Sequence, residues 1–159
     1  MKRDYLLWVT VMMLGLHFLE EVGLDFVGWM ETTIVPHAPF VRCTWTEFHL
    51  LNGAYLLYAI GAAVIGWRWP AVALSSPALL AINGLFFHLG GSIVTWSFSP
   101  GVVTGLALFL PAAAAGYYGA WKDGVLTRPT LVWSIVIGVL LTLYPFGMLL
   151  MRHYIRPLA

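Results

Sequence analysis

Five long apolar stretches constrain the fold of this chain more than any other feature of its sequence. They run from about Tyr5 to Trp29, Thr46 to Trp67, Ala71 to Trp96, Gly101 to Trp121 and Pro129 to Met151. The hydrocarbon core of a bilayer is about 30 Å thick, so a spanning helix needs roughly 20 apolar residues. We therefore predict an all-α polytopic membrane bundle, a single domain over residues 1–159 with about five transmembrane helices.

The composition supports this prediction and excludes several other classes of protein. Only 9% of the residues are charged and 60% are hydrophobic, whereas soluble domains carry about 25% charged residues. A soluble globular enzyme and a disordered chain are therefore excluded. The net charge of +1 offers no surface for nucleic-acid phosphates. We expect the lipid bilayer as the main partner and no nucleic acid, and the sequence leaves an oligomer open. The single cysteine, Cys43, excludes a disulfide framework.

The basic residues between the apolar stretches predict the orientation in the membrane. The side that holds the N-terminus has five of them, Lys2, Arg3, Arg68, Lys122 and Arg128, and the other side has three, Arg42, Arg152 and Arg156. Cytoplasmic loops are enriched in lysine and arginine. We therefore expect the N-terminus on the cytoplasmic side.

The first apolar stretch contains three acids, Glu20, Glu21 and Asp25, although it reads as transmembrane. An ionisable side chain at the centre of a bilayer costs about 2.5–3.5 kcal/mol on insertion scales. Several acids together therefore need a metal, a proton, each other or a water-filled cavity. The alternative is that they mark the end of a short first helix among the headgroups. The apolar run before them, residues 5–16, is too short to span alone, so we expect the helix to continue through the acids.

The spacing of the polar residues indicates a metal site. His17, Glu21 and Asp25 are four residues apart and should share one helix stripe, with Glu20 on the neighbouring edge. A histidine and a glutamate at i and i+3 or i+4 are frequent metal ligands in helical bundles. The candidate metal ligands are His17, Glu20, Glu21, His49 and His88. Such ligands suit zinc, iron or manganese, and a site without metal is the open alternative.

Other residues are candidates for catalysis and for substrate binding. The candidate acids and bases are Glu20, Glu21, Asp25 and Glu47. Glu47 also fits a capping box with Thr44, which would give it a purely structural role. The candidate substrate-binding residues are Trp8, Asn52, Tyr55, Asn83, Phe87 and Trp96. The aromatic members of this set could line a pocket and stabilise a cationic intermediate.

Three short motifs follow one another along the chain. His17, Glu20 and Glu21 give H-x-x-E-E, Asn83 and His88 give N-x-x-x-x-H, and residues 99–104 give S-P-G-x-x-T. Over roughly residues 10–115 the chain resembles the HXXEE-domain family of small bacterial integral membrane proteins. The resemblance implies a bacterial inner-membrane location. It also implies a metal or catalytic centre at His17, Glu20 and Glu21, together with Asn83 and His88. The acid-rich stretch from residue 25 to residue 47 and the additional His49 depart from the simplest form of this pattern.

These observations predict a small intramembrane enzyme that acts on a lipophilic small molecule, such as a lipid, an isoprenoid or a sterol-like compound. With a metal, the site would activate water or dioxygen beside the lipid phase. Without one, a desolvated glutamate would serve as general acid or base, as an isomerase or cyclase of lipid metabolism requires. The alternatives are a non-enzymatic lipid-binding or partner-stabilising membrane protein and a proton- or metal-conducting channel.

Overall fold

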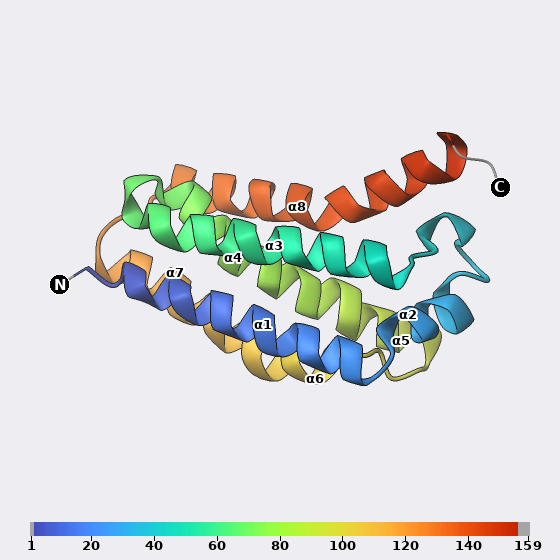
Figure 1. Cartoon of the computed structure of the whole chain (residues 1–159). Coiled ribbons are helices and arrows are strands. Elements are labelled where there is room, and N and C mark those ends of the chain that lie inside the picture. The colour runs from blue at the N-terminus through green and yellow to red at the C-terminus, as the bar shows by residue number, and fades with distance from the viewer. Residues whose placement is uncertain (1, 156–159) are drawn as a thin grey trace.

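The apolar stretches form helices in the computed structural model, which describes residues 2–155 (Figure 1). Five helical segments are long and apolar enough to cross a membrane: Asp4–Gly23, Trp45–Arg68, Pro70–Thr95, Val102–Lys122 and Arg128–Ile155. They contain α1 (Leu7–Gly23), α3 (Trp45–Ile65), α4 (Pro70–Ile82) followed by α5 (Gly90–Thr95), α6 (Val102–Thr104) followed by α7 (Leu110–Lys122), and α8 (Arg128–Ile155). Short 3-10 turns occur at Asp4–Leu6, Pro39–Val41 and Gly66–Arg68. The chain is therefore an integral membrane protein, and the prediction of an all-α bundle with five spans is confirmed.

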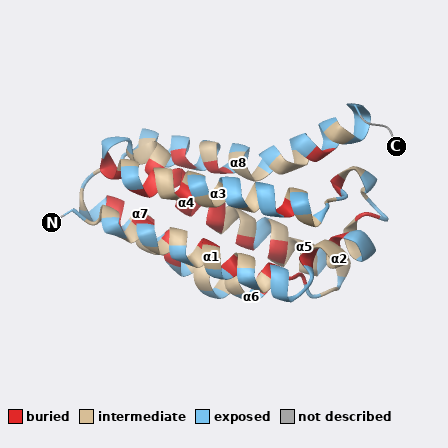
Figure 2. Ribbon diagram, in the orientation of Figure 1, coloured by how far each residue is buried: buried red, intermediate tan, exposed pale blue. Residues whose placement is uncertain are grey.

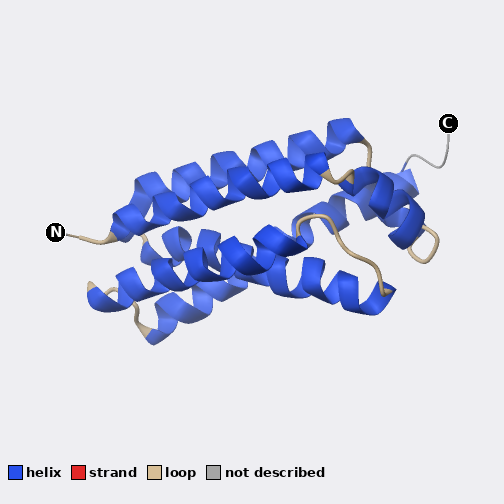
Figure 3. Ribbon diagram, turned by 90° about the horizontal axis from the view of Figure 1, so that it is seen from below, coloured by secondary structure: helices blue, strands red, loops and turns tan. Residues whose placement is uncertain are grey.

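The helices lie side by side and short loops join most of them, and no strand occurs within residues 2–155 (Figure 3). The central element is α4, which packs against α1, α3, α7 and α8. Residues 73–80 of this helix are all buried, whereas the other helices bury one face each (Figure 2). A helix that is apolar on every side belongs in the interior of a bundle. The outer faces carry exposed apolar side chains such as Leu57, Val94 and Leu140, which suit contact with lipid chains.

The start of α1 and the end of α8 lie at opposite ends of the bundle (Figure 1). Arg3 is hydrogen-bonded to Asp123 at one end, and Arg152 is hydrogen-bonded to the Arg42 carbonyl at the other. The separation of basic residues expected from the sequence is therefore present for these side chains, while Arg156 lies outside the described residues. The side of the membrane that each end faces stays a prediction.

The first helix is shorter than the apolar stretch over residues 5–29, because α1 ends at Gly23. Asp25 takes a left-handed backbone conformation with φ of 53°, and its carboxylate accepts a hydrogen bond from the Gly28 N–H at 3.1 Å. Aspartate tolerates this conformation and is a favourable residue for starting a helix. A new helix, α2 (Phe26–Trp29), begins there. Asp25 therefore does not continue the stripe of candidate ligands on α1, and that part of the sequence prediction is wrong.

Two of the spans contain a π-helical turn, a feature that is rare in helices and frequent at functional sites. Asn83–Leu89 lies between α4 and α5, and Gly105–Phe109 lies between α6 and α7; a third such turn, Met30–Ile34, follows α2. The first two turns touch through their glycines. A Cβ on Gly84 would lie 2.5 Å from the carbonyl oxygen of Gly105. The two backbones are therefore in direct contact at this point.

Asp123 ties the loop after α7 to the start of the chain. The Arg3 backbone N–H donates to its carboxylate, the Arg3 guanidinium does so at 2.7 Å, and the Trp67 indole N–H donates at 2.9 Å. These hydrogen bonds, with that from the Arg3 backbone contributing most, hold the pKa of Asp123 below its ordinary value of 3.8. A carboxylate whose pKa is lowered by folding stabilises the folded state above its ordinary pKa, and this contribution is lost as the pH falls further.

The expected result is a loss of thermal stability in acid that depends on Asp123. In detergent, the thermal unfolding midpoint Tm of the wild type should fall more steeply below pH 3.8 than that of Asp123→Asn, which has no charge to lose. At pH 7 the variant should have the lower Tm. Parallel pH profiles for the two proteins would show that the charge of Asp123 adds nothing to stability.

Candidate functional site

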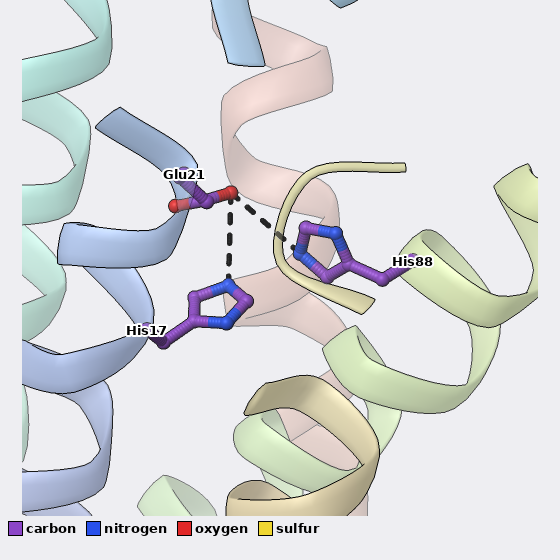
Figure 4. A group of neighbouring side chains, drawn as sticks. All are labelled: His17, Glu21 and His88. Atoms are coloured by element: carbon purple, nitrogen blue, oxygen red, sulfur yellow. Dashed lines mark ion pairs between the residues drawn. The ribbon is translucent and has the colours of Figure 1, made fainter. Parts of the chain in front are cut away.

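His17, Glu21 and His88 meet in the interior of the bundle (Figure 4). The Nε2 atoms of both histidines lie 3.6 Å from the same oxygen, Oε1 of Glu21. The imidazole rings are 4.7 Å apart between centroids and nearly perpendicular. All three residues are buried, with His88 fully so. One ligand atom from each residue lies within 4.8 Å of the other two, so the three side chains could hold a metal ion.

A hydroxyl group binds the other nitrogen of each histidine. His17 Nδ1 lies 2.7 Å from Oγ1 of Thr104, and His88 Nδ1 lies 3.2 Å from Oγ of Ser99. Each hydroxyl donates its own proton to a nearby backbone carbonyl, at 3.4 Å for Thr104 and 3.3 Å for Ser99. A hydroxyl has only one proton, so a hydroxyl that donates to its carbonyl accepts from an Nδ1–H. In that tautomer each Nε2 has a lone pair directed toward Glu21.

Glu20 is adjacent to the cluster, but its carboxylate binds backbone N–H groups rather than the histidines. Its carboxylate accepts backbone hydrogen bonds from Gly101 at 3.1 Å, Val103 at 3.3 Å and Thr104 at 2.8 Å. Negative charge is favourable at the N-terminus of a helix, where free N–H groups accumulate. The Val102–Lys122 span begins here, so Glu20 holds the start of this span against α1. The same loop carries the two hydroxyls that position the histidines.

Gly101 allows this loop to lie directly on the two imidazoles. Its φ is 93°, in the left-handed region. A Cβ at this position would lie 2.5 Å from Cε1 of His88 and 2.6 Å from Cε1 of His17. No side chain fits in this space, and only glycine adopts the backbone conformation without strain.

Two cavities border the cluster at Glu21. One has a volume of about 90 Å³, and the other, of about 30 Å³, also borders His17. A water molecule needs roughly 10–15 Å³ of such volume, so each cavity can hold at least one. Both are lined by Glu21, Asn52, Tyr55 and Asn83. The walls of the larger cavity are mostly apolar and include Phe26, Phe48, Phe87 and Phe146.

One polar atom in the walls of these cavities is unsatisfied. The side-chain oxygen of Asn83 is buried and has no hydrogen-bond partner among the described residues. The Tyr55 hydroxyl, in contrast, donates to the carbonyl of Leu141 at 2.8 Å. Buried polar atoms are nearly always hydrogen-bonded in proteins. Asn83 is therefore available to a molecule that enters the cavity.

The structure brings together seven of the residues predicted from the sequence and leaves five others elsewhere. His17, Glu21 and His88 form the cluster, and Asn52, Tyr55, Asn83 and Phe87 line a cavity beside it. Asp25, Glu47, His49, Trp8 and Trp96 lie away from it, and Trp96 is almost fully exposed. Glu20 contacts the loop over the cluster rather than the cavities.

The residues left outside the cluster have other local partners. Glu47 accepts hydrogen bonds from the backbone N–H and hydroxyl of Thr44, both at 2.9 Å, which confirms the capping box. His49 is exposed, and its Nδ1 lies 2.6 Å from the carbonyl of Trp45 in its own helix. The structure therefore gives neither side chain a contact with the cluster.

Three residues of the site carried no assigned role in the sequence, namely Ser99, Gly101 and Thr104. They belong to the S-P-G-x-x-T motif, and the motif was the only sign of their importance. Cys43 also lines the larger cavity. Burial raises the pKa of its thiol to about 11, so the thiol stays protonated at neutral pH and is a poor metal ligand in that form.

One comparison with known proteins found a match. A family model described as "Protein of unknown function with HXXEE motif" matches residues 8–116. This range contains His17, Glu20, Glu21, His88 and the loop that carries Ser99 and Thr104. Comparison with curated proteins found no match, and neither did comparison with solved structures. Because the match covers more than half of the 159 residues, the chain belongs to the HXXEE family.

Proposed function

We propose that this protein is an intramembrane metalloenzyme that acts on a lipophilic small molecule and holds its metal ion with His17, Glu21 and His88. One observation carries the proposal: the Nε2 atoms of two histidines and a carboxylate oxygen converge at a buried point, and His88 Nε2 has no hydrogen-bond partner among the described residues. Buried acceptors that face one another are unfavourable unless something positive lies between them. A metal ion satisfies all three.

The distances favour a metal ion over a shared proton. Both histidine nitrogens lie 3.6 Å from Glu21 Oε1, which is too long for a hydrogen bond through a proton. Ligand atoms at about 2.0–2.2 Å from a tetrahedral zinc ion are about 3.3–3.6 Å from each other. The observed separations therefore match two ligands of one ion. Hydrogen bonds from Nδ1 to Thr104 and Ser99 are the kind of outer contact that orients metal-binding histidines.

The ligand set supports a catalytic site more than a structural one. Structural zinc sites are closed by four protein ligands, whereas catalytic sites have three protein ligands and an open position. Two histidines and one carboxylate also suit iron(II), and the carboxylate makes manganese a further candidate. Such an ion lowers the pKa of bound water or polarises a substrate oxygen. The chain's own residues would fix the ion and keep it away from bulk water.

The cavities support a lipophilic substrate. The larger cavity is walled by phenylalanines and reaches Glu21, so an apolar group could lie beside the open position of the ion. Asn52 and Asn83 offer amide groups in the same walls. A few polar groups in an apolar pocket typically fix the orientation of a ligand. Asn83, with its free oxygen, is the residue we expect to bind a polar group of the substrate.

Elemental analysis of the detergent-purified protein tests the proposal, with two histidine variants as a matched pair. Wild-type protein should contain close to one equivalent of zinc, iron or manganese. His17→Ala should lose it, since it removes a ligand. His49→Ala should retain it, because His49 is exposed and bonded within its own helix. A metal found only in the wild type and in His49→Ala would also identify the reaction class to search.

The contrary result is equally informative. Folded wild-type protein that lacks metal, and that takes up no zinc, iron(II) or manganese when these are added, would overturn the metal site. The remaining readings would then be acid–base catalysis by Glu21 and a non-enzymatic lipid-binding protein. Equal metal content in His17→Ala and the wild type would place the ion elsewhere in the chain.

A further inference from the structure

Apart from the two cavities at Glu21, an apolar space lies on the outside of the bundle, between α3 and α8. Its volume is about 320 Å³. Leu50, Leu51 and Ala54 line it from α3, and Tyr144, Met148 and Leu149 line it from α8. Glu47 and Arg152 lie at one end. We refer to it as the lateral groove, and its walls suit a hydrocarbon chain.

The lateral groove adjoins the cavity at the candidate metal centre. Leu51 and Leu149 line both spaces, so these two side chains separate the groove from the cavity that reaches Glu21. Leu149 is one of the few buried residues of α8. A change of rotamer in these two leucine side chains would join the two spaces.

Pro145 gives α8 the shape that opens the lateral groove. A proline inside a helix leaves the carbonyl four residues earlier without its usual partner and kinks the helix. That carbonyl belongs to Leu141, and the Tyr55 hydroxyl of α3 donates to it at 2.8 Å. Toward its C-terminal end α8 turns away from α3 (Figure 1). The hydrogen bond from Tyr55 links the two helices.

The cationic group at the end of the groove is Arg152, which is paired there with Glu47. Arg152 binds the Glu47 carboxylate and the Arg42 carbonyl. Glu47 also accepts two hydrogen bonds from Thr44, so it stays bonded if Arg152 turns to another anion. A guanidinium has five donors in a planar fork that matches a carboxylate. Arg152 is thus the exchangeable member of the pair.

We propose that the lateral groove binds a single-chain carboxylate amphiphile, a long-chain fatty acid, with its carboxylate on Arg152 and its chain directed toward the cavity at Glu21. This inference rests on the proposed function, because it identifies the lipophilic substrate class of the same site. Headgroup and metal centre would then contact different parts of the molecule.

Binding of cis-parinaric acid, a fluorescent fatty acid, tests the inference in lipid nanodiscs. Energy transfer from the protein's tryptophans reports binding, and the alcohol with the same chain serves as the uncharged probe. Arg152→Gln should weaken binding of the acid about tenfold or more, the cost of losing a charge-assisted hydrogen bond. It should leave binding of the alcohol unchanged. Arg152→Lys, which keeps the charge, should recover part of the affinity.

Three further variants sharpen the test. Glu47→Gln preserves the capping box, which accepts either residue, and frees Arg152 from its competitor, so binding of the acid should become tighter. Ala54→Trp should block the groove and abolish binding of both probes. Arg128→Gln removes an arginine at the opposite end of α8 and should change nothing. Nonspecific partitioning of the probe into the lipid would not make binding tighter in Glu47→Gln and weaker in Arg152→Gln.

Two outcomes would overturn the inference. The first is equal affinity for acid and alcohol in the wild type, and the second is unchanged binding of the acid in Arg152→Gln of normal Tm. The titration is repeated with His17→Ala, which lacks a proposed metal ligand but leaves the groove intact. Fatty acid binding in both proteins, with no metal in the wild type, would refute the proposed metal site and support the groove.

Discussion

Replacing Glu21 by glutamine is expected to remove the metal and leave the protein folded, whereas the same replacement of its neighbour Glu20 is expected to retain the metal and lower the stability of the fold. Glu21 Oε1 faces both histidines, and a neutral amide is a poor ligand for zinc or iron. The loss in affinity should exceed the roughly 10–100-fold cost of losing an outer-shell partner. Zinc should therefore raise the Tm of the wild type and not that of Glu21→Gln.

Glu20→Gln should retain the ion and lose stability. The amide has one acceptor oxygen, while the carboxylate accepts three backbone N–H groups with two. Losing one charge-assisted bond at a partly exposed site costs about 1–3 kcal/mol, which lowers the Tm by several degrees in a chain of this size. Metal content and Tm of the two variants are measured in the same preparations. Loss of metal in both, or in neither, would contradict the division of roles within the H-x-x-E-E motif.

Gly101→Ala is expected to be the most damaging single-methyl change in the loop over the histidines. The added Cβ would lie 2.5 Å and 2.6 Å from the two imidazoles, and overpacking of this kind costs about 1–3 kcal/mol. The positive φ adds about 1–2 kcal/mol for any residue other than glycine. Relief of the contact requires the loop or the histidines to shift. We therefore expect lower metal content as well as a lower Tm.

Gly124→Ala provides the matched control for the backbone conformation. Gly124 also has a positive φ, of 71°, but a Cβ there meets nothing within 4 Å. Its substitution should cost only the conformational part and leave the metal bound. The difference in Tm between the two variants isolates the contact of residue 101 with the histidines. Equal shifts in Tm, with metal retained in both, would show that the loop does not press on the cluster.

Part of the candidate site followed from local spacing. His17 and Glu21 are one helical turn apart, so a helix over residues 5–21 is enough to place them on one face. The apolar residues before the acids required the helix to continue through them, and α1 does so. The same reasoning gave a wrong position for Asp25, because α1 ends before it and its side chain caps the next helix. Residue spacing predicts a shared face only for residues within one continuous helix.

The remainder of the site depends on contacts between distant segments. Asn83 and His88 are five residues apart, so an α-helix would point them roughly 140° from each other. The π-helical turn over Asn83–Leu89 changes this relation and lets both face the centre of the bundle. His49 has the same side chain as His88 and also lies within an apolar span, yet it is exposed. The sequence composition around the two histidines does not predict which of them is buried.

Hydropathy and length are properties of single segments, and they were sufficient to establish five spans, the all-α class and the membrane as solvent. The roles of Glu20 and Glu21 are not properties of one segment. Neighbours on a helix point about 100° apart, so one carboxylate reaches a loop more than 80 residues away and the other reaches the histidines. Which partner each acid meets was set by the packing of Val102–Lys122 and Pro70–Thr95 against α1. The buried glycines at that contact made the close approach sterically possible.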